Sequence, residues 1–92
     1  MIKEVEQFEW NGRPQNNHIV ISTSDGNHYL VSYGKVVASK GVDGVRLSSR
    51  YWDYSRTTTK FVVRFLGCEN AREVKANIRS GRYQVVPELI IP

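Results

Sequence analysis

The segment from Ser55 to Gly67 constrains the fold most, because it carries a helix start signal, a stop signal and an amphipathic pattern between them. The hydroxyl of Ser55 can accept a hydrogen bond from a free N–H of a first helical turn, and Gly67 can adopt the left-handed conformation that ends a helix. At 100° per residue, one broad face of the intervening segment gathers Thr58, Phe61, Val62, Phe65 and Leu66. We therefore expect a helix over residues 56–66 whose apolar face packs against a sheet.

The opposite face of this expected helix is basic. Arg56, Lys60 and Arg64 follow one another at intervals of four residues, which makes them neighbours on a helix surface. The segment also fits a β-strand, because Thr57–Thr59 and Phe61–Val63 are β-forming runs. We favour the helix, which would present the three basic side chains to solvent.

The first half of the chain alternates β-forming runs with turn signals. Strands are expected over residues 3–10, 18–22, 28–33, 36–39 and 45–48. Asn11-Gly12 predicts a turn that residues 13–17 extend into a longer loop, and Asp25-Gly26 predicts a type I′ hairpin turn. Short connections of this kind join antiparallel neighbours, so the sequence predicts an antiparallel meander of four to five strands.

The second half predicts another helix and a last strand. The helix is expected to begin at Glu69 or Asn70, with Asn70 as its cap, and to end at Gly81. Residues 83–86 are expected to form a strand that Pro87 ends. The predicted fold is therefore α+β: an antiparallel β-meander, two short helices on one face and a C-terminal strand, all in a single domain over residues 1–92.

The C-terminal tail, residues 88–92, carries Leu89, Ile90 and Ile91. We expect this apolar segment to pack on the domain itself or on a second subunit, which would make the protein a homo-oligomer.

Chain length and cysteine content limit the class of protein. The 92 residues suffice for one small domain with a thin core. Cys68 is the single cysteine, which excludes an internal disulfide and fits a reducing compartment. No apolar run reaches the roughly 18 residues of a membrane span, and three glutamates stand where a signal peptide would be basic and then apolar. The sequence therefore predicts a cytosolic protein without membrane association.

Charge is distributed unevenly along the chain. Residues 1–12 hold one lysine against three glutamates, a net charge of −2, whereas residues 46–82 hold nine basic against three acidic residues, a net charge of +6. A concentrated positive field attracts phosphate groups or acidic protein surfaces. The same distribution is also compatible with a soluble surface that has a basic bias.

The residue types that support catalysis lack a catalytic arrangement. His18, His28 and Cys68 show no metal-ligand spacing, and both histidines are expected as polar residues at strand ends. No glycine-rich phosphate loop and no nucleophile-elbow pattern occurs. We therefore expect no enzyme, metal or cofactor.

The start of the expected central helix favours anion binding, because a helix N-terminus offers free N–H groups and a partial positive charge. Cations and hydroxyl groups surround it, and Trp52 is expected as a ring on which a base could stack. The predicted ligand-binding residues are Arg46, Arg50, Trp52, Ser55, Arg56, Thr57, Thr59 and Lys60. These residues also have a purely structural interpretation, in which Ser55 caps the helix and the aromatic residues fill the core.

The two helices could also act as one wider basic surface. Arg64 on the first helix and Arg72, Lys75 and Arg79 on the second would belong to it. Such a surface suits nucleic acid, with affinity that falls steeply as salt rises, and equally suits an acidic protein partner. No recognisable nucleic-acid module accompanies it.

One block of the sequence resembles a known family. Residues 51–58, YWDYSRTT, followed by Lys60, by Phe65-Leu66-Gly67 and by residues 80–83, SGRY, are similar to a family of small uncharacterised proteins from bacteriophages, prophages and other mobile elements. The resemblance covers roughly residues 33–83, and the chain departs from the family pattern at Val62-Val63 and at Cys68. It implies a phage accessory protein in a bacterial cytoplasm, and it carries no established activity.

Taken with the basic charge, this resemblance leads to an expected function. We expect a non-enzymatic accessory protein that binds a nucleotide or nucleic acid, in the context of countering host defence. The alternative is a protein–protein inhibitor that binds an acidic host factor through its basic helix surface.

Overall fold

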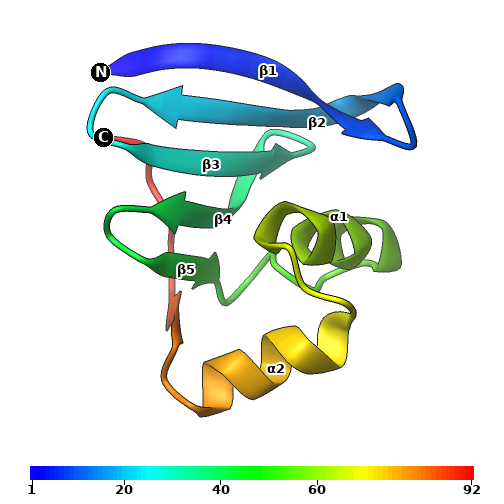
Figure 1. Ribbon diagram of the computed structural model, residues 1–92, viewed down its shortest axis with the longest axis vertical. Helices are drawn as coiled ribbons and strands as arrows, with labels where there is room; N and C mark the ends of the chain where they lie inside the picture. The colour runs from blue at the N-terminus through cyan, green and yellow to red at the C-terminus, as the bar shows by residue number, and fades with distance from the viewer.

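Six strands form one sheet, and their order in the sheet is their order along the chain. The computed structural model describes residues 1–92. The strands are β1 (Ile2–Trp10), β2 (Arg13–Thr23), β3 (Asn27–Ser32), β4 (Lys35–Gly41), β5 (Val45–Ser48) and β6 (Tyr83–Val86). Two helices, α1 (Arg56–Leu66) and α2 (Ala71–Arg79), stand between β5 and β6 in the chain (Figure 1). The predicted α+β class is confirmed, with a meander from β1 to β5.

The last strand pairs differently from the first five. Neighbouring strands from β1 to β5 are antiparallel, whereas β6 runs parallel to β5, with Val45 opposite Tyr83 and Ser48 opposite Val86. Parallel neighbours need a crossover connection, and α1 and α2 provide it. The helix pair returns the chain to the end of the sheet where β5 began.

Both helices have the N-terminal caps that the sequence predicts, although α2 begins at Ala71, after its cap, and not at Glu69 or Asn70. The Ser55 side chain accepts a hydrogen bond from the Thr58 N–H, and Gly67 ends α1 in the left-handed conformation with φ of 74°. Asn70 caps α2 by accepting a hydrogen bond from the Glu73 N–H. The helix interpretation of residues 56–66 is therefore confirmed against the strand alternative.

The predicted loop over residues 13–17 is wrong, because β2 already begins at Arg13. Asn11 and Gly12 have φ of 53° and 78°, so they alone form a two-residue turn of the I′ type. Strand β3 pairs with β2 only from His18 onward, so the first part of β2 has β1 as its sole neighbour. Pro14 has no N–H to donate, but no strand pairs with this part of β2 on the side away from β1. The proline therefore removes no hydrogen bond from the sheet there. The β1–β2 hairpin consequently extends past the end of β3 (Figure 1).

The turn at Asp25-Gly26 also differs from its prediction. Strand β2 ends at Thr23 and β3 begins at Asn27, so the loop has three residues, and only Gly26 has positive φ. This is the three-residue hairpin with a left-handed glycine, whereas the predicted type I′ turn needs positive φ at two residues.

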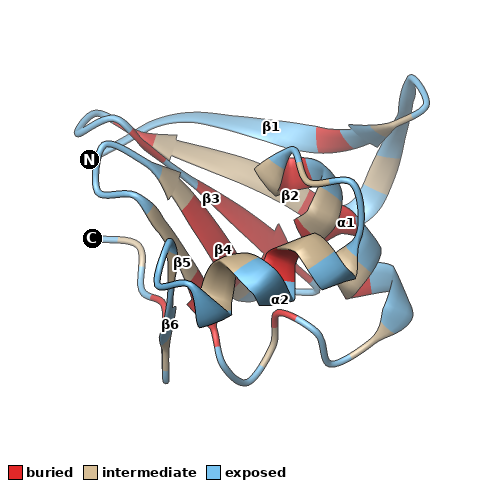
Figure 2. Cartoon of the chain, turned by 60° about the horizontal axis from the view of Figure 1, so that its bottom comes forward, coloured by how far each residue is buried: buried red, intermediate tan, exposed pale blue.

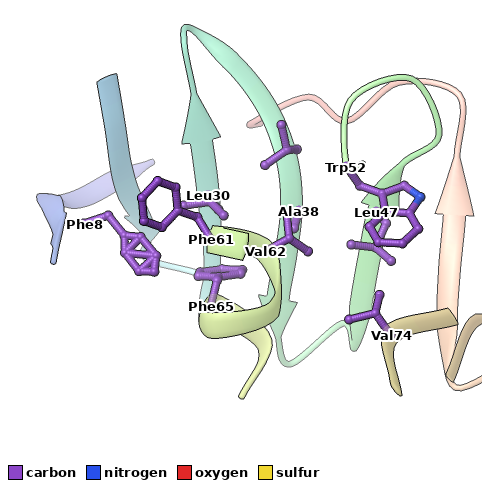
Figure 3. Close-up of a cluster of buried hydrophobic side chains, with 10 residues drawn as sticks. Phe8, Leu30, Ala38, Leu47, Trp52, Phe61, Val62, Phe65 and Val74 are labelled. Atoms are coloured by element: carbon purple, nitrogen blue, oxygen red, sulfur yellow. The ribbon is translucent and has the colours of Figure 1, made fainter. Parts of the chain in front are cut away.

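The hydrophobic core lies between the sheet and the two helices (Figure 3). Buried residues concentrate on β3 and β4 and on the sides of α1 and α2 that meet the sheet (Figure 2). The core consists of Phe8, Leu30, Val37, Ala38, Leu47, Trp52, Phe61, Val62, Phe65 and Val74. Val62, where the chain departs from the phage-family pattern, is fully buried.

The opposite face of the sheet is covered in part by the C-terminal tail. Because side chains alternate along a strand, Tyr29 and Val31 point away from the face that Leu30 gives to the core. Both are nevertheless buried. The tail runs behind β5 and β4 in Figure 1 and ends near β3. Leu89 in this tail is 7% exposed, so the tail packs on its own domain. This is the first of the two arrangements that the sequence predicts.

His18 is not the polar strand-end residue that the sequence suggests, because it is 2% exposed. Its ring lies 4.2 Å from that of Phe61 and 5.1 Å from that of Tyr33, measured between centroids. The Nδ1 atom is 2.9 Å from the carbonyl oxygen of Asn16, and Nε2 is buried without a partner. The histidine therefore acts as a core aromatic residue beneath α1.

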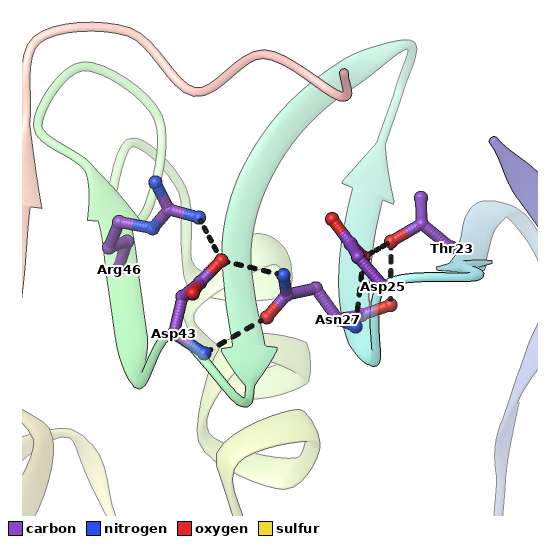
Figure 4. A network of polar contacts seen from close by, with 5 residues as sticks. All are labelled: Thr23, Asp25, Asn27, Asp43 and Arg46. Atoms are coloured by element: carbon purple, nitrogen blue, oxygen red, sulfur yellow. Dashed lines mark hydrogen bonds and ion pairs between the residues drawn. The ribbon is translucent and has the colours of Figure 1, made fainter.

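A polar network joins the β2–β3 loop to the β4–β5 turn (Figure 4). The Asn27 side chain donates a hydrogen bond to Asp43 Oδ2 at 2.8 Å and accepts one from the Asp43 N–H at 3.3 Å. Thr23 donates its hydroxyl hydrogen to Asp25, which lowers the pKa of that carboxyl below its ordinary value. The two turns are thereby held together at one end of the sheet.

Candidate functional site

The largest cavity of the molecule is a groove along the outer side of α1, with a volume of about 660 Å³. The end of β1 contributes Trp10 to its wall, and the loop before α1 contributes Asp53, Tyr54 and Ser55. Its other end is formed by the connection from α1 to α2. The remaining lining residues are Arg56, Thr59, Lys60, Val63, Arg64, Cys68, Glu69, Asn70 and Ala71.

The basic stripe of α1 lies inside this groove. Arg56, Lys60 and Arg64 are all exposed and line it together, spaced by about 6 Å along the helix axis at 1.5 Å per residue. The structure contains one ion pair, between Arg46 and Asp43 at 3.9 Å, so none of the three stripe cations is neutralised by a direct partner. The groove also holds the carboxylates of Asp53 and Glu69, which leaves one net positive charge in its lining.

Trp10 holds two of these cations in place. The Lys60 Nζ lies 4.4 Å from the centroid of the Trp10 ring and the Arg64 Cζ lies 5.2 Å from it, both within cation–π range. Trp10 itself packs edge-on against Phe61, with centroids 5.6 Å apart. Because Trp10 is half-buried, its ring is both the floor for the cations and an aromatic surface of the groove.

Sequence reasoning missed Trp10 as a site residue. Trp10 was expected only as the last residue of a strand over residues 3–10, without a role in binding. The tryptophan reaches the groove because the β1–β2 hairpin extends past β3 and over α1. That extension depends on residues 13–17 being strand, so the predicted loop there removed the signal that could have found it.

The first turn of α1 uses its hydroxyl groups internally. The Ser55 Oγ accepts the Thr58 N–H at 3.1 Å, and the Thr59 hydroxyl donates to the Ser55 carbonyl oxygen at 2.9 Å. Thr58 is buried and its hydroxyl lies 3.0 Å from that of Ser32. Thr57 is exposed but does not line the groove. The cap and the cations, more than free hydroxyl groups, therefore define this end of the groove.

Besides Thr57, three other predicted ligand-binding residues lie outside the groove. Trp52 is 6% exposed and belongs to the core, which contradicts its expected role as a stacking ring. Arg46 is on the sheet face away from the helices, because its neighbour Leu47 faces the core, and it contacts Asp43. Arg50 lines a separate cavity. The structure therefore brings together Ser55, Arg56, Thr59 and Lys60 of the predicted set, and it adds Arg64.

The basic residues of α2 are exposed outside the groove. Arg72, Lys75 and Arg79 have no ion-pair partner and do not line the cavity beside α1. The wider basic surface predicted across both helices is thus divided into the stripe in the groove and a second cluster on α2.

Cys68 lines the groove at the end of α1 and contacts the last strand. Its sulfur is 3.3 Å from the hydroxyl oxygen of Tyr83. Burial, reinforced by the Cys68 thiol, raises the pKa of Tyr83 to about 12. No group of three or more His, Cys, Asp or Glu side chains is arranged to hold a metal ion. Neither helix has the length and apolar content that a membrane-spanning helix needs.

The fold and groove define a small α+β domain with a basic groove along one helix, walled in part by aromatic residues. The chain belongs to the family of unknown function DUF8033, whose defining pattern matches residues 6–81. The match includes the YWDYSRTT block and extends into β1, further toward the N-terminus than the phage resemblance. Searches of curated proteins and of solved structures found no match.

Proposed function

We propose that the protein is a non-enzymatic binding module that holds a phosphate-bearing ligand, a nucleotide or nucleic acid, in the groove along α1. One observation carries this proposal. Arg56, Lys60 and Arg64 form an unpaired row of cations inside the largest cavity, and Trp10 holds two of them over its ring. Cations with adjacent aromatic rings suit a ligand that combines phosphate groups with bases.

Tyr54 supports the same ligand chemistry. Tyr54 lines the groove and is 50% exposed, so its side chain is accessible to a base. Trp10 lies against the opposite end of the stripe, over Lys60 and Arg64. The groove therefore has Tyr54 at the end near the start of α1 and Trp10 in its wall, in contact with Lys60 and Arg64.

We also propose the biological setting of this module, an accessory protein of a bacteriophage that acts in the bacterial cytoplasm against host defence. The resemblance of roughly residues 33–83 to phage and mobile-element proteins supports this setting, as does the single, unbridged Cys68. A phage gene of this kind, expressed in its host, should protect phage growth only when the groove is intact.

The proposal is tested with fluorescein-labelled oligothymidylate of 12 nucleotides and with ATP as probes. Replacing Arg56 and Lys60 by alanine should weaken binding of both probes at least tenfold. Affinity for the oligonucleotide falls as salt rises, and in this variant it should fall less steeply. The slope of log affinity against log salt should become shallower by about 1.4, since each phosphate contact on a single strand contributes about 0.7. Fluorescence anisotropy measures the first probe, and displacement of it measures the second.

The matched control is Lys75→Ala with Arg79→Ala, which removes the same charge from α2, outside the groove. This variant should bind both probes within twofold of the unchanged protein. Equal weakening by the two double variants would show attraction to net charge alone, and absence of binding to either probe would refute the proposal.

A second candidate function is inhibition of an acidic host protein. The observation that favours it is the exposed cluster of Arg72, Lys75 and Arg79, which lies outside the groove and has no ion-pair partner. The same two double variants separate the candidates. A host protein that is captured by the Arg56/Lys60 variant and lost with the Lys75/Arg79 variant would support this second function.

A further inference from the structure

A second basic cavity lies on the other side of the loop that leads into α1. It has a volume of about 540 Å³ and lies between the β3–β4 turn, the end of β5 and the residues that follow β6. Lys35 and Arg50 line it, both exposed and both without an ion-pair partner. Glu88 is its single acidic residue, so the lining is net positive like that of the groove.

Two tyrosines form the ridge between the two cavities. Tyr51 lines the second cavity, Tyr54 lines the groove, and their rings meet edge-on with centroids 6.0 Å apart and an interplanar angle of 86°. The Lys35 Nζ lies 5.6 Å from the centroid of the Tyr51 ring. The ridge is therefore aromatic on both sides and has cations next to it in each cavity.

Positively charged side chains and aromatic rings alternate along a path that runs through the two cavities and over the ridge. Lys35 and Arg50 come first, then the tyrosine pair, then the stripe of α1, and finally Trp10. The stripe alone spans about 12 Å from Arg56 to Arg64, at 1.5 Å per helical residue. A single nucleotide would occupy one cavity and leave the cations of the other unused.

We propose that the ligand is single-stranded nucleic acid, whose backbone passes from the Lys35/Arg50 cavity across the tyrosine ridge into the groove of α1. This inference depends on the function proposed above and adds the class of ligand. Unpaired bases can stack on Tyr51 and Tyr54, and stacking of this kind tolerates any sequence. A duplex keeps its bases inside the helix and cannot stack them on these rings, and an acidic peptide has no bases to stack.

The size of the molecule sets the expected length of the bound strand. Its longest principal extent is 31 Å, and the stripe of α1 alone accounts for about 12 Å of the path. We expect a site of about 4 to 6 nucleotides, at the lower end of the range for small single-strand-binding domains.

The test compares oligothymidylates of 3 and 12 nucleotides, a 12-base-pair duplex and ATP, by fluorescence anisotropy and competition. Lys35→Ala with Arg50→Ala should weaken binding of the 12-mer about tenfold and lower its salt slope by about 1.4, while ATP binding in the groove stays within twofold. Tyr54→Ala should weaken the 12-mer at least fivefold, and Tyr54→Phe should not. The 12-mer should bind at least tenfold more tightly than the 3-mer.

Several outcomes would overturn this inference while leaving the groove proposal intact. The Lys35/Arg50 variant would bind the 12-mer normally although the Arg56/Lys60 variant does not. Alternatively, the 3-mer or the duplex would bind as tightly as the 12-mer. Two other outcomes would remove both proposals. One is displacement of the 12-mer by a polyglutamate peptide at equal charge concentration, which would assign the path to an acidic protein. The other is absence of binding of every nucleic-acid and nucleotide probe by the unchanged protein.

Discussion

Gly41, at the end of β4, lies where the two turns of the polar network touch. Its φ is +145°, and a Cβ placed on it would lie 2.3 Å from the Gly26 carbonyl oxygen and 2.8 Å from the Asn27 Cα. Both obstacles are backbone atoms, which cannot rotate away. Only glycine therefore allows the β2–β3 loop and the β4–β5 turn to approach this closely.

Replacing Gly41 by alanine should lower the free energy of unfolding by about 3–5 kcal/mol, from backbone strain and from steric overlap together. The control is Gly44→Ala in the same turn, where φ is +85° and no atom lies within 4 Å of the added Cβ. That substitution should cost about 1–2 kcal/mol from backbone strain alone. Urea denaturation measures both, and equal losses would show that the close approach at Gly41 carries no energetic weight.

At the scale of elements, Tyr83 connects β6 to the segment that follows α1. Its hydroxyl contacts the Cys68 sulfur at 3.3 Å, and the pKa of Tyr83 is raised to about 12, mainly by burial. The unfolded chain releases this proton near pH 10. Between about pH 10 and 12 the folded state therefore holds a proton that the unfolded state has lost, so stability falls as pH rises.

The expected result is that Tyr83→Phe loses less stability than the unchanged protein when pH rises from about 10 to 12. Burial lowers the pKa of Lys40, which changes stability in the opposite direction, but Lys40 is present in both proteins and its effect cancels in the comparison. Urea midpoints at several alkaline pH values measure the difference. Parallel pH profiles for the two proteins would contradict the raised pKa.

The helices could be predicted from sequence because their signals are local. Ser55 and Asn70 accept their capping hydrogen bonds from N–H groups three residues away, and Gly67 ends α1 by its own conformation. The parallel direction of β6 had no local signal, because its partner β5 is far away in the chain. The strand over residues 13–17 did have one, since Asn11-Gly12 is typical of a two-residue hairpin turn that Arg13 follows directly. The turn-forming residues Pro14, Asn16 and Asn17 favoured the loop instead.

The candidate site divides in the same way. Helical periodicity alone places Arg56, Lys60 and Arg64 on one face, so that part of the groove followed from the sequence. Trp10 could not be assigned to the groove from the sequence, because it is far from α1 in the chain. Only the folded β1–β2 hairpin places it beside Lys60 and Arg64. Trp52 was assigned to the wrong environment, since an aromatic residue beside a helix start can face either the core or solvent.

At the scale of the whole molecule, the C-terminal tail covers part of the second face of the sheet. Leu89 is 7% exposed, whereas its neighbour Ile90 is 69% exposed. Because the two residues are adjacent and of similar size, a comparison of their substitutions isolates the effect of burial on stability. The tail should stabilise the domain through Leu89 and leave Ile90 to solvent.

Leu89→Ala should therefore destabilise the protein by about 2–3 kcal/mol, in the range for a buried leucine. Ile90→Ala should change the free energy of unfolding by no more than about 0.5 kcal/mol, as for an exposed position. Thermal and urea denaturation measure both variants. A larger loss with Ile90→Ala would instead indicate that the tail packs on a second subunit, and sedimentation equilibrium would then show a dimer.

The central claim at this scale is that the groove along α1 binds the ligand. The two tryptophans provide its most direct test. Trp10 lies in the groove and Trp52 in the core, so their indole N–H signals in a ¹⁵N–¹H spectrum report on separate environments. On titration with single-stranded oligothymidylate, the Trp10 signal and the amides of residues 54–64 should shift together while the Trp52 signal stays in place. Shifts confined to α2, the tail or β1 away from Trp10, or an unchanged Trp10 signal at saturating oligonucleotide, would contradict the account.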